Sequence, residues 1–453
     1  MSVHKYIAKV MKTTMESTPG QTEFYQAVEE VLSTLEPILK AEPKYDQYNI
    51  LERIVIPERQ ILFRVTWMDD ANKIQTNIGY RVQFNSAIGP YKGGLRFHQN
   101  VNLGIIKFLG FEQIFKNSLT GLAIGGGKGG SNFNPKGKSD GEIMRFCQSF
   151  MIELSKHIGE TRDVPAGDIG VGGREIGYMF GEYKRVTGNF EGILTGKGIN
   201  WGGSLTRTEA TGFGSVYFAE NILNKQNDSL KDKVATVSGS GNVAIYTIQK
   251  LYDMNAKPVT CSDSRGMIYD KNGINLDTLK LIKEIQRSSL EEYILIHKDA
   301  TYLPIHKYPQ GANAVWAVPC DIAFPSATQN ELNLKDMKNL YKNGCKLVCE
   351  GANMPTTPEA IEFMLEKKML FGPAKAANAG GVATSQLEMS QNASMQKWSF
   401  AEVDGKLRKI MKSIFDLSYE TSKEFEHEGN LMIGANIAGF KKVADSMIDQ
   451  GAV

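Results

Sequence analysis

One stretch of the sequence constrains the fold more than any other. Residues 233–238 are rich in β-branched side chains, and Gly239-Ser-Gly-Asn-Val-Ala244 follows them and opens a helical pattern. A second apolar run, 258–262, ends at Asp263, which comes 22 residues after Gly241. This order of strand, glycine turn, helix, strand and acid predicts a dinucleotide-binding βαβ unit. In such a unit the glycines let a pyrophosphate lie against the amides of the helix N-terminus.

The chain is long enough for two domains and has an ordinary globular composition. Its 453 residues exceed the size at which a single core stops growing, and 42% of them are apolar. The net charge is +2 and there is no long basic run, so we expect no nucleic-acid partner. No uncharged apolar stretch approaches the roughly 18 residues of a membrane span, and the N-terminus lacks a secretory h-region. We expect a cytoplasmic protein without a membrane partner.

Cysteine and histidine usage gives no sign of a disulfide framework or a metal site. The five cysteines are scattered and odd in number, which favours reduced structural thiols. The six histidines show no metal-ligand spacing, so we expect no metal.

The pattern of the chain changes near residue 200, after the glycine-rich segment 195–203. Before it, helical spacing predicts helices over 22–41, 102–117 and 139–155, and alternation over 53–86 predicts a hairpin and meander. After it, helices alternate with strands, with strands expected at 321–324, 346–349 and about 369–371. We therefore predict an α/β protein of two domains separated by a cleft. One domain spans 1–201, completed by the C-terminal helix 429–453, and a doubly wound, Rossmann-like domain spans 202–428.

Three charged residues before the change lie among glycines and prolines. Lys128 lies in Gly125–Gly130, Lys92 follows Gly89-Pro-Tyr91, and Asp168 ends Pro165-Ala-Gly-Asp168. The segment around Lys128 does not match a phosphate-binding P-loop, which has a glycine six residues before the lysine and Ser or Thr after it. A single such residue is most simply a turn. Three within eighty residues indicate a site, because glycine lets backbone come close to a ligand.

Long stretches of the chain resemble the hexameric, small-subunit type of glutamate dehydrogenase in the Glu/Leu/Phe/Val dehydrogenase superfamily. The stretches are 89–97, 108–116, 126–130, 165–168, 350–356, 375–381 and 434–440, so the likeness covers nearly the whole chain. The resemblance implies reversible oxidative deamination of L-glutamate to 2-oxoglutarate and ammonium with a nicotinamide cofactor, serving ammonium assimilation and amino-acid metabolism. It also implies a homohexamer, a substrate-binding and oligomerisation role for the N-terminal domain with a mixed sheet, and dinucleotide binding by the other domain.

The resemblance assigns the substrate contacts by position. Lys92 and Ser385 are expected to bind the side-chain carboxylate of glutamate, and Lys116 with Gln113 to bind its α-carboxylate. Gly167 is expected to contribute its backbone. Fixed cations and donors are what a cleft needs to replace the hydration of two carboxylates.

The resemblance also assigns the chemistry. Lys128 is expected to act as acid and base through a water on the α-carbon, with its pKa lowered toward neutrality by Lys116 and an enclosed site. Asp168 is expected to accept protons from the amine and to stabilise the cationic imine. We expect the glycines around Lys128 to bring backbone close to a small dianion.

The cofactor residues follow from the glycine turn and from the resemblance. They are Thr211, Gly239, Ser240, Gly241, Asn242, Val243, Asp263, Ser264, Arg265 and Asn378. Asp263 alone would favour NAD, because a carboxylate repels a 2′-phosphate. Ser264 and Arg265 could instead bind that phosphate, and we favour NADP, although Gln286 stands where many NADP-using relatives carry lysine.

Two departures from the family pattern lie beside expected contacts. Gln386 stands where glycine commonly follows the substrate serine, and Thr208 stands where proline is usual after Arg207. Two alternatives to glutamate dehydrogenase stay open. One is a dehydrogenase for a branched or aromatic amino acid, and the other is a catalytically inactive homologue.

Overall fold

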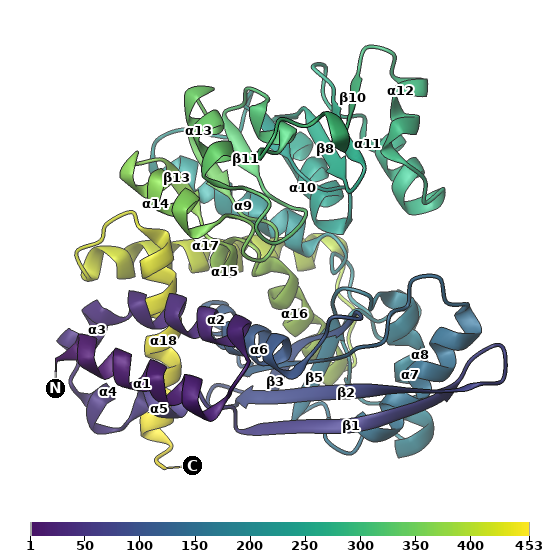
Figure 1. Cartoon of the computed structure of the whole chain (residues 1–453), viewed down its shortest axis with the longest axis vertical. Helices are drawn as coiled ribbons and strands as arrows, with labels where there is room; N and C mark the ends of the chain where they lie inside the picture. Colours follow the sequence, from purple (N-terminus) through teal and green to yellow (C-terminus); the bar gives the residue numbers. More distant parts are fainter. Residues whose placement is uncertain (1, 453) are drawn as a thin grey trace. The chain divides into compact units, whose positions relative to one another are not determined.

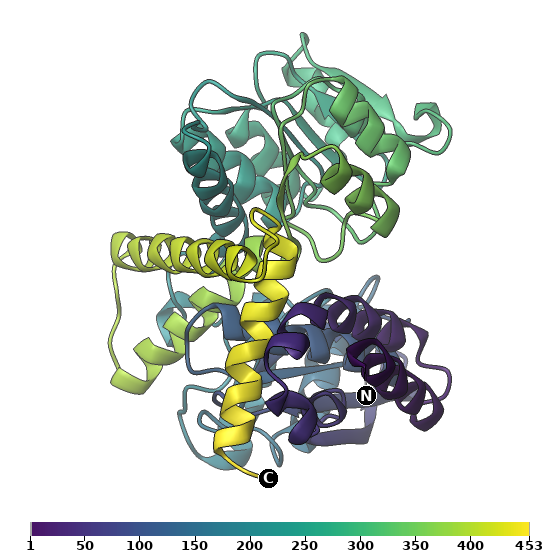
Figure 2. The ribbon, with the colours of Figure 1, turned by 90° about the vertical axis from the view of Figure 1, so that its left-hand side faces the viewer.

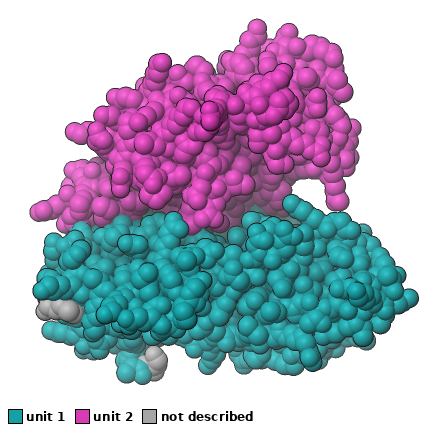
Figure 3. All heavy atoms as spheres, in the orientation of Figure 1, with its two compact units in different colours: residues 1–207, 382–403, 435–453 teal, residues 208–381, 404–434 magenta. Residues whose placement is uncertain are grey.

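The computed structural model describes residues 2–452, which form two compact units (Figure 3). Unit 1 comprises Met1–Arg207, Val382–Val403 and Ala435–Val453, and unit 2 comprises Thr208–Gly381 and Asp404–Gly434. The α/β, two-unit architecture agrees with the predicted fold class. The boundaries of the two units differ from those of the predicted domains, because segment 382–403 belongs to unit 1. Ser385 and Glu388 of this segment bond to Arg207 and to the backbone of Gly196, which holds it there.

Unit 1 is built on a five-stranded mixed sheet with the order β1-β2-β4-β3-β5 (Figure 1). Its strands are β1 (Arg59–Met68), β2 (Ile74–Asn85), β3 (Tyr91–Phe97), β4 (Gly126–Ser131) and β5 (Asp163–Gly167). β1 and β2 form the predicted antiparallel hairpin, and β4 pairs antiparallel with β2 but parallel with β3. β4, which carries Lys128, is therefore the central strand.

Helices cover this sheet and also form the N-terminal segment that precedes it in the chain. They are α1 (Val3–Ser17), α2 (Thr22–Thr34), α3 (Glu36–Ala41), α4 (Lys44–Gln47), α5 (Ile50–Ile54), α6 (Leu103–Leu119), α7 (Asp140–Leu154) and α8 (Gly173–Thr187). α6 packs on β2 and β4, and the aromatic rings of Phe84, Phe111 and Phe24 lie together there. Ser139 starts α7 with a capping box to Glu142, as its sequence predicts.

The C-terminal helix returns to unit 1, as predicted. α18 (Leu431–Asp449) lies beside the N-terminal helices (Figure 2). Phe440 packs edge-on against Tyr45 at 5.1 Å, and Ser118 of α6 donates to the carbonyl of Gly439. This packing joins the two ends of the described chain in one unit.

Unit 2 is a parallel sheet with the order β13-β12-β11-β6-β7. Its strands are β6 (Val234–Val237), β7 (Lys257–Pro258), β11 (Ile322–Phe324), β12 (Leu347–Cys349) and β13 (Leu370–Gly372). An antiparallel sheet of β8 (Thr260–Asp263), β9 (Gly266–Tyr269) and β10 (Thr301–Pro304) adjoins it and was not predicted. The helices are α9 (Ala210–Lys225), α10 (Asn242–Asp253), α11 (Leu276–Lys280), α12 (Tyr293–Ile296), α13 (Leu334–Lys342), α14 (Pro358–Glu366), α15 (Ala374–Ala377) and α17 (Phe400–Glu424).

Some helices differ from the sequence prediction. The helix expected over 22–41 is divided after Thr34, because Pro37 opens a new helix, α3. α16 (Gly380–Ser394), which carries Ser385, was not predicted. Residues on several sides of α16 are buried, so its sequence lacks an apolar stripe with a period of 3.6. In the part of the chain that the structure describes, no helix is long and apolar enough to cross a membrane.

Candidate functional site

The glycines around Lys128 form a buried strand rather than a loop. All six residues of β4 are buried. A Cβ on Gly125 would lie 2.3 Å from the carbonyl oxygen of Asn85, and one on Gly126 would lie 2.8 Å from the backbone nitrogen of Ile114 in α6. The structure thus accounts for these glycines by close packing of the chain against itself. The sequence predicts that these glycines bring backbone close to a ligand. At Gly125 and Gly126 the space beside the glycine is instead filled by the protein's own backbone.

Lys128 projects to the α6 side of the sheet and meets Asp168 there. A Cβ on Gly110 of α6 would be 3.5 Å from the Cβ of Lys128. The Nζ of Lys128 lies 2.7 Å from Oδ2 of Asp168, and Nε of Arg96 donates to the same oxygen at 3.1 Å. The side chain of Lys128 is 7% exposed and that of Asp168 is 17% exposed. A nearly enclosed carboxylate is therefore shared by two cations.

This arrangement shifts the titration of both groups. Burial lowers the pKa of Lys128, and the charges of Arg96 and Arg81 lower it further, whereas Asp168 raises it. Burial raises the pKa of Asp168, but Lys128 and Arg96 outweigh burial and bring that pKa well below its usual range. The pKa of Lys128 is thus lowered, and Arg96 and Arg81 contribute to this direction. Asp168 stays ionised at neutral pH.

α6 carries Gln113 and Lys116 and ties together the strands of the two other lysines. The buried side chain of Asn117 donates to the carbonyl of Lys92 in β3 at 3.1 Å and to the carbonyl of Gly125 at 2.5 Å. Gln113 donates to the Asn117 side chain at 2.6 Å. Gln113 and Lys116 are both half-buried. Asn117 fixes the start of β4 relative to β3, a role that the sequence did not reveal.

Lys92 is enclosed in unit 1 and is only 1% exposed. Its Nζ donates to Oγ1 of Thr195 at 2.7 Å. Burial lowers its pKa well below the usual value, and Arg207, Arg81 and Lys197 act in the same direction, whereas Glu388 opposes them. Within residues 2–452, Lys92 forms no ion pair with a carboxylate.

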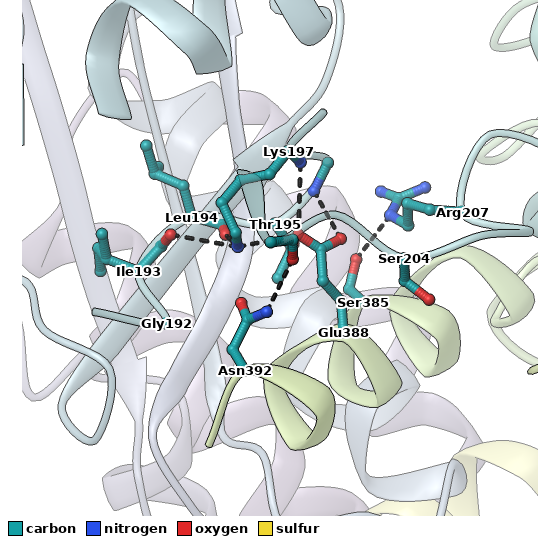
Figure 4. Close-up of polar contacts among 12 residues, drawn as sticks. Gly192, Ile193, Leu194, Thr195, Lys197, Ser204, Arg207, Ser385, Glu388 and Asn392 are labelled. Carbon is teal, nitrogen blue, oxygen red and sulfur yellow. Dashed lines mark hydrogen bonds and ion pairs between the residues drawn. The ribbon is translucent and has the colours of Figure 1, made fainter. Parts of the chain in front are cut away.

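Ser385 bonds to Arg207, whose charge acts on Lys92. Nε of Arg207 donates to Oγ of Ser385 at 2.9 Å (Figure 4). Like Lys92, Arg207 forms no ion pair within the described residues. The half-buried guanidinium of Arg207 was missed as a site residue, although it was noted beside Thr208. A cluster of donors and cations around a serine, short of carboxylates, suits an anionic ligand.

The last expected unit 1 residue, Gly167, ends β5 directly before Asp168. It pairs with Leu95 of β3. A Cβ on Gly94 would lie 2.7 Å from the Gly167 carbonyl and 2.9 Å from the Cβ of Asp168. Glycine at 94 therefore lets β3 come close to the strand end that presents Asp168.

In unit 2 the glycine turn has the expected geometry. Gly239 has a φ of +86°, which favours glycine, and its amide donates to Oγ of Ser262 at 2.9 Å. Gly241 is the N-cap of α10, and a Cβ there would meet no atom of residues 2–452 within 4 Å. Ser240, Asn242 and Val243 lie beside it. The open space at the N-terminus of α10 fits a phosphate-bearing ligand.

Asp263 ends β8, and a cation already pairs with it. Its Oδ2 lies 3.3 Å from Nζ of Lys283, and its Oδ1 accepts the amide of Arg265 at 2.9 Å. Ser264 and Arg265 form the exposed turn between β8 and β9. Lys283 offsets the charge of the carboxylate, and the exposed Arg265 side chain adds a second cation. With these two cations beside it, the carboxylate of Asp263 is less unfavourable to a 2′-phosphate than it would be alone.

The remaining cofactor candidates are also in unit 2. Thr211 is half-buried in the first turn of α9. Asn378 donates to the carbonyl of Ala352 at 3.1 Å and to the side chain of Asn353 at 2.9 Å, while its own buried Oδ1 has no partner among the described residues. An orphaned buried acceptor is costly unless a ligand supplies a donor. The candidate residues therefore fit a dinucleotide. Among residues 2–452, no group of three or more His, Cys, Asp or Glu side chains could hold a metal ion.

Comparison with known proteins gives matches over almost the whole chain. The family model described as Glutamate/Leucine/Phenylalanine/Valine dehydrogenase matches residues 202–451, and the model of the dimerisation domain of Glu/Leu/Phe/Val dehydrogenases matches residues 57–185. The NADP-specific glutamate dehydrogenase of Helicobacter pylori is 61% identical over 446 residues, which cover 98% of this chain and 100% of the relative. The NAD-specific glutamate dehydrogenase of Bacteroides fragilis is 52% identical over 447 residues, which cover 99% of this chain and 100% of the relative.

A solved structure agrees with these sequence matches. The crystal structure of Plasmodium falciparum glutamate dehydrogenase superposes with a TM-score of 0.96 at 52% identity. The superposition covers 100% of this chain and 96% of that one.

Proposed function

Because the chain belongs to the Glutamate/Leucine/Phenylalanine/Valine dehydrogenase family, we propose that it is an NADP-dependent glutamate dehydrogenase. It converts L-glutamate to 2-oxoglutarate and ammonium, or catalyses the reverse reaction in ammonium assimilation. The observation that carries the choice of substrate is the buried Lys92, which lacks a carboxylate partner among residues 2–452. A side-chain carboxylate on the substrate supplies that partner.

We assign the two carboxylates of the substrate to different groups in unit 1. Lys92 and Ser385 bind the side-chain carboxylate, and Arg207, which donates to Ser385, adds positive charge. Lys116 and Gln113 bind the α-carboxylate, with the backbone of Gly167 nearby. Branched or aromatic substrates offer no charge to Lys92, so burying that lysine beside them would leave it unpaired.

Lys128 and Asp168 perform the proton transfers. The lowered pKa of Lys128 favours a neutral amine that can accept a proton from the water attacking the α-carbon of the imine. The ionised Asp168 accepts a proton from the substrate amine, or from incoming ammonia in the reverse direction, and stabilises the cationic imine. Arg96 keeps the carboxylate charged and in place through its contact with Oδ2.

Residues of unit 2 hold the cofactor. The amides at the start of α10, following Gly239 and Gly241, would hold the pyrophosphate, and Ser264 with Arg265 would bind the 2′-phosphate. Thr211, Ser240, Asn242, Val243 and Asn378 would complete the contacts, and Asp263, paired with Lys283, would bind the ribose. When bound, the nicotinamide would supply hydride transfer to or from the substrate α-carbon. We assign substrate binding and oligomerisation to the N-terminal domain and its C-terminal helix, and dinucleotide binding to residues 202–428.

We also propose a homohexamer. The β1–β2 hairpin exposes apolar side chains at alternate positions of paired strands, which places them on one face. Leu62 is 62%, Met68 44%, Ile74 66% and Ile78 38% exposed. An apolar face of this kind is typical of a subunit contact. The five buried free thiols support a cytoplasmic location.

The test of this proposal is the oxidation of NADPH by the purified protein. Oxidation that requires both 2-oxoglutarate and ammonium is expected. No oxidation with this pair by a folded protein would instead favour an inactive homologue.

A further inference from the structure

A buried carboxylate lies close to the Lys92 site and has no role in the reaction described above. Glu388 lies on α16 three residues after Ser385, so both side chains project from the same side of the helix. Its side chain is 0% exposed. Oε1 lies 2.9 Å from Nζ of Lys197, and Oε2 accepts the amide of Gly196 at 2.9 Å (Figure 4).

Glu388 holds the segment that orients Lys92. Besides Gly196, the amide of Lys197 donates to Oε1 at 3.3 Å, so one carboxylate binds two successive backbone amides. The preceding residue, Thr195, supplies the Oγ1 that accepts from Lys92 at 2.7 Å. Lys197 in turn donates to the carbonyls of Ile193 and Leu194, as Figure 4 shows. The position of Thr195 therefore depends on Glu388.

The charge balance around Lys92 also depends on Glu388. The charged groups that shift the pKa of Lys92 most are Arg207, Glu388, Arg81 and Lys197. Arg81 is bound to Asp163, which is wholly buried with it. Glu388 is thus the only carboxylate among these groups, and it favours the protonated form of Lys92 while the three cations oppose it.

We propose that Glu388 is a positioning residue, the shared counter-ion that holds Thr195 and keeps Lys92 charged for the substrate's side-chain carboxylate. This inference rests on the proposed function, because Lys92 acts on the substrate and Glu388 acts only through Lys92. Lys92 and Lys197 are both buried and Arg207 is half-buried, so the site needs such a counter-ion, since unpaired buried charges are strongly destabilising.

The experiment compares Glu388→Gln with the wild type by measuring kcat and the KM for 2-oxoglutarate across pH. Glutamine keeps an oxygen for one of the two amides but removes the charge. Lys92 then loses its proton at a lower pH. The KM for 2-oxoglutarate, which rises as Lys92 loses its proton, is therefore expected to rise at a pH about 1 unit or more below that of the wild type, with a smaller change in kcat. A KM profile that matches the wild type would overturn the inference.

Two further variants separate charge from structure. Glu388→Asp keeps the charge and should keep the wild-type profile. The double variant Lys197→Met/Glu388→Gln removes one cation with the carboxylate and should shift the profile back toward the wild type. If Glu388→Asp and Glu388→Gln lose activity equally with unchanged pH dependence, the role is structural only and the inference is wrong. A wild-type protein that does not turn over 2-oxoglutarate refutes the proposed function, whereas an active wild type with an unshifted Glu388→Gln refutes this inference alone.

Discussion

The Nζ of Lys128 lies 2.7 Å from Oδ2 of Asp168 although the two residues come from different strands of the unit 1 sheet. Lys128 is on the central strand β4, and Asp168 follows β5 at the sheet edge, with β3 between them. The close glycine packing of β3, β4 and β5 brings these two strand positions within reach of one proton. Sheet packing therefore explains the glycine content of this region. The proposed chemistry depends on the two side chains, Lys128 and Asp168, that this packing brings together.

Lys128→Met is expected to lower kcat by roughly 10²- to 10⁴-fold, the usual contribution of a positioned acid or base. Methionine fills a similar volume, so the fold should persist, which circular dichroism checks. The matched control is Lys156→Ala, because Lys156 is an exposed lysine whose ion pair lies on the surface. Retention of full activity by Lys128→Met would contradict the assigned role.

Lys92→Met is expected to raise the stability of the protein while removing glutamate turnover. Burial holds the pKa of Lys92 below its unfolded value, so the unfolded chain binds the extra proton. The wild type therefore gains stability as pH rises from the folded pKa toward the unfolded value. The variant should be more stable by about 1–4 kcal/mol at and below the folded pKa, with the difference shrinking toward about pH 10.4.

Urea unfolding at several pH values measures this difference. An ordinary exposed lysine has no such effect, so Lys156→Met should show no pH-dependent gain. A Lys92→Met protein that is less stable than the wild type near neutral pH would mean that the lysine is stabilising, contrary to the structure.

Lys283→Met is expected to raise the KM for NADPH by about 10- to 100-fold and to change the KM for NADH much less. Without Lys283, the carboxylate of Asp263 repels the 2′-phosphate, and charge-assisted bonds are worth about 1.5–3 kcal/mol. Initial rates with both cofactors measure this, with the exposed Lys271→Met as control. Equal effects on both cofactors would show that Lys283 does not read the phosphate.

Leu62→Arg is expected to weaken the assembly, because it places a charge on the exposed apolar face of the β1–β2 hairpin. Light scattering after size-exclusion chromatography should show smaller species than the wild type. Met395→Arg is the control, because Met395 is exposed and lies outside the hairpin, and it should leave the mass unchanged. An unchanged mass for Leu62→Arg would exclude this face as a subunit contact.

Much of the fold could be predicted because local signals were strong. The turn Gly239–Ala244 and the acid Asp263 fixed the nucleotide-binding unit, and alternation predicted the β1–β2 hairpin. The elements that were missed are those in which burial hides the apolar pattern, as in α16, or whose partners lie far away in the sequence. Glycine-rich β4 looked like a loop because glycine has low strand propensity, and only its neighbours in space make it a strand.

The site was predicted in part for the same reason. Lys92, Lys128 and Asp168 were found through their glycine surroundings and the family resemblance. Asn117, Thr195, Lys197 and Glu388 were not, since a buried amide or ion pair leaves no spacing signal in a single sequence. Their partners lie up to 192 residues away, as for Gly196 and Glu388.

The recognition of a side-chain carboxylate by buried Lys92 is tested most directly by comparing kcat/KM of the wild type for L-glutamate and L-leucine with NADP. The account predicts a large preference for glutamate, because leucine leaves Lys92 unpaired at a cost of several kcal/mol, or about 10²-fold or more in rate. Equal or faster turnover of leucine would contradict it.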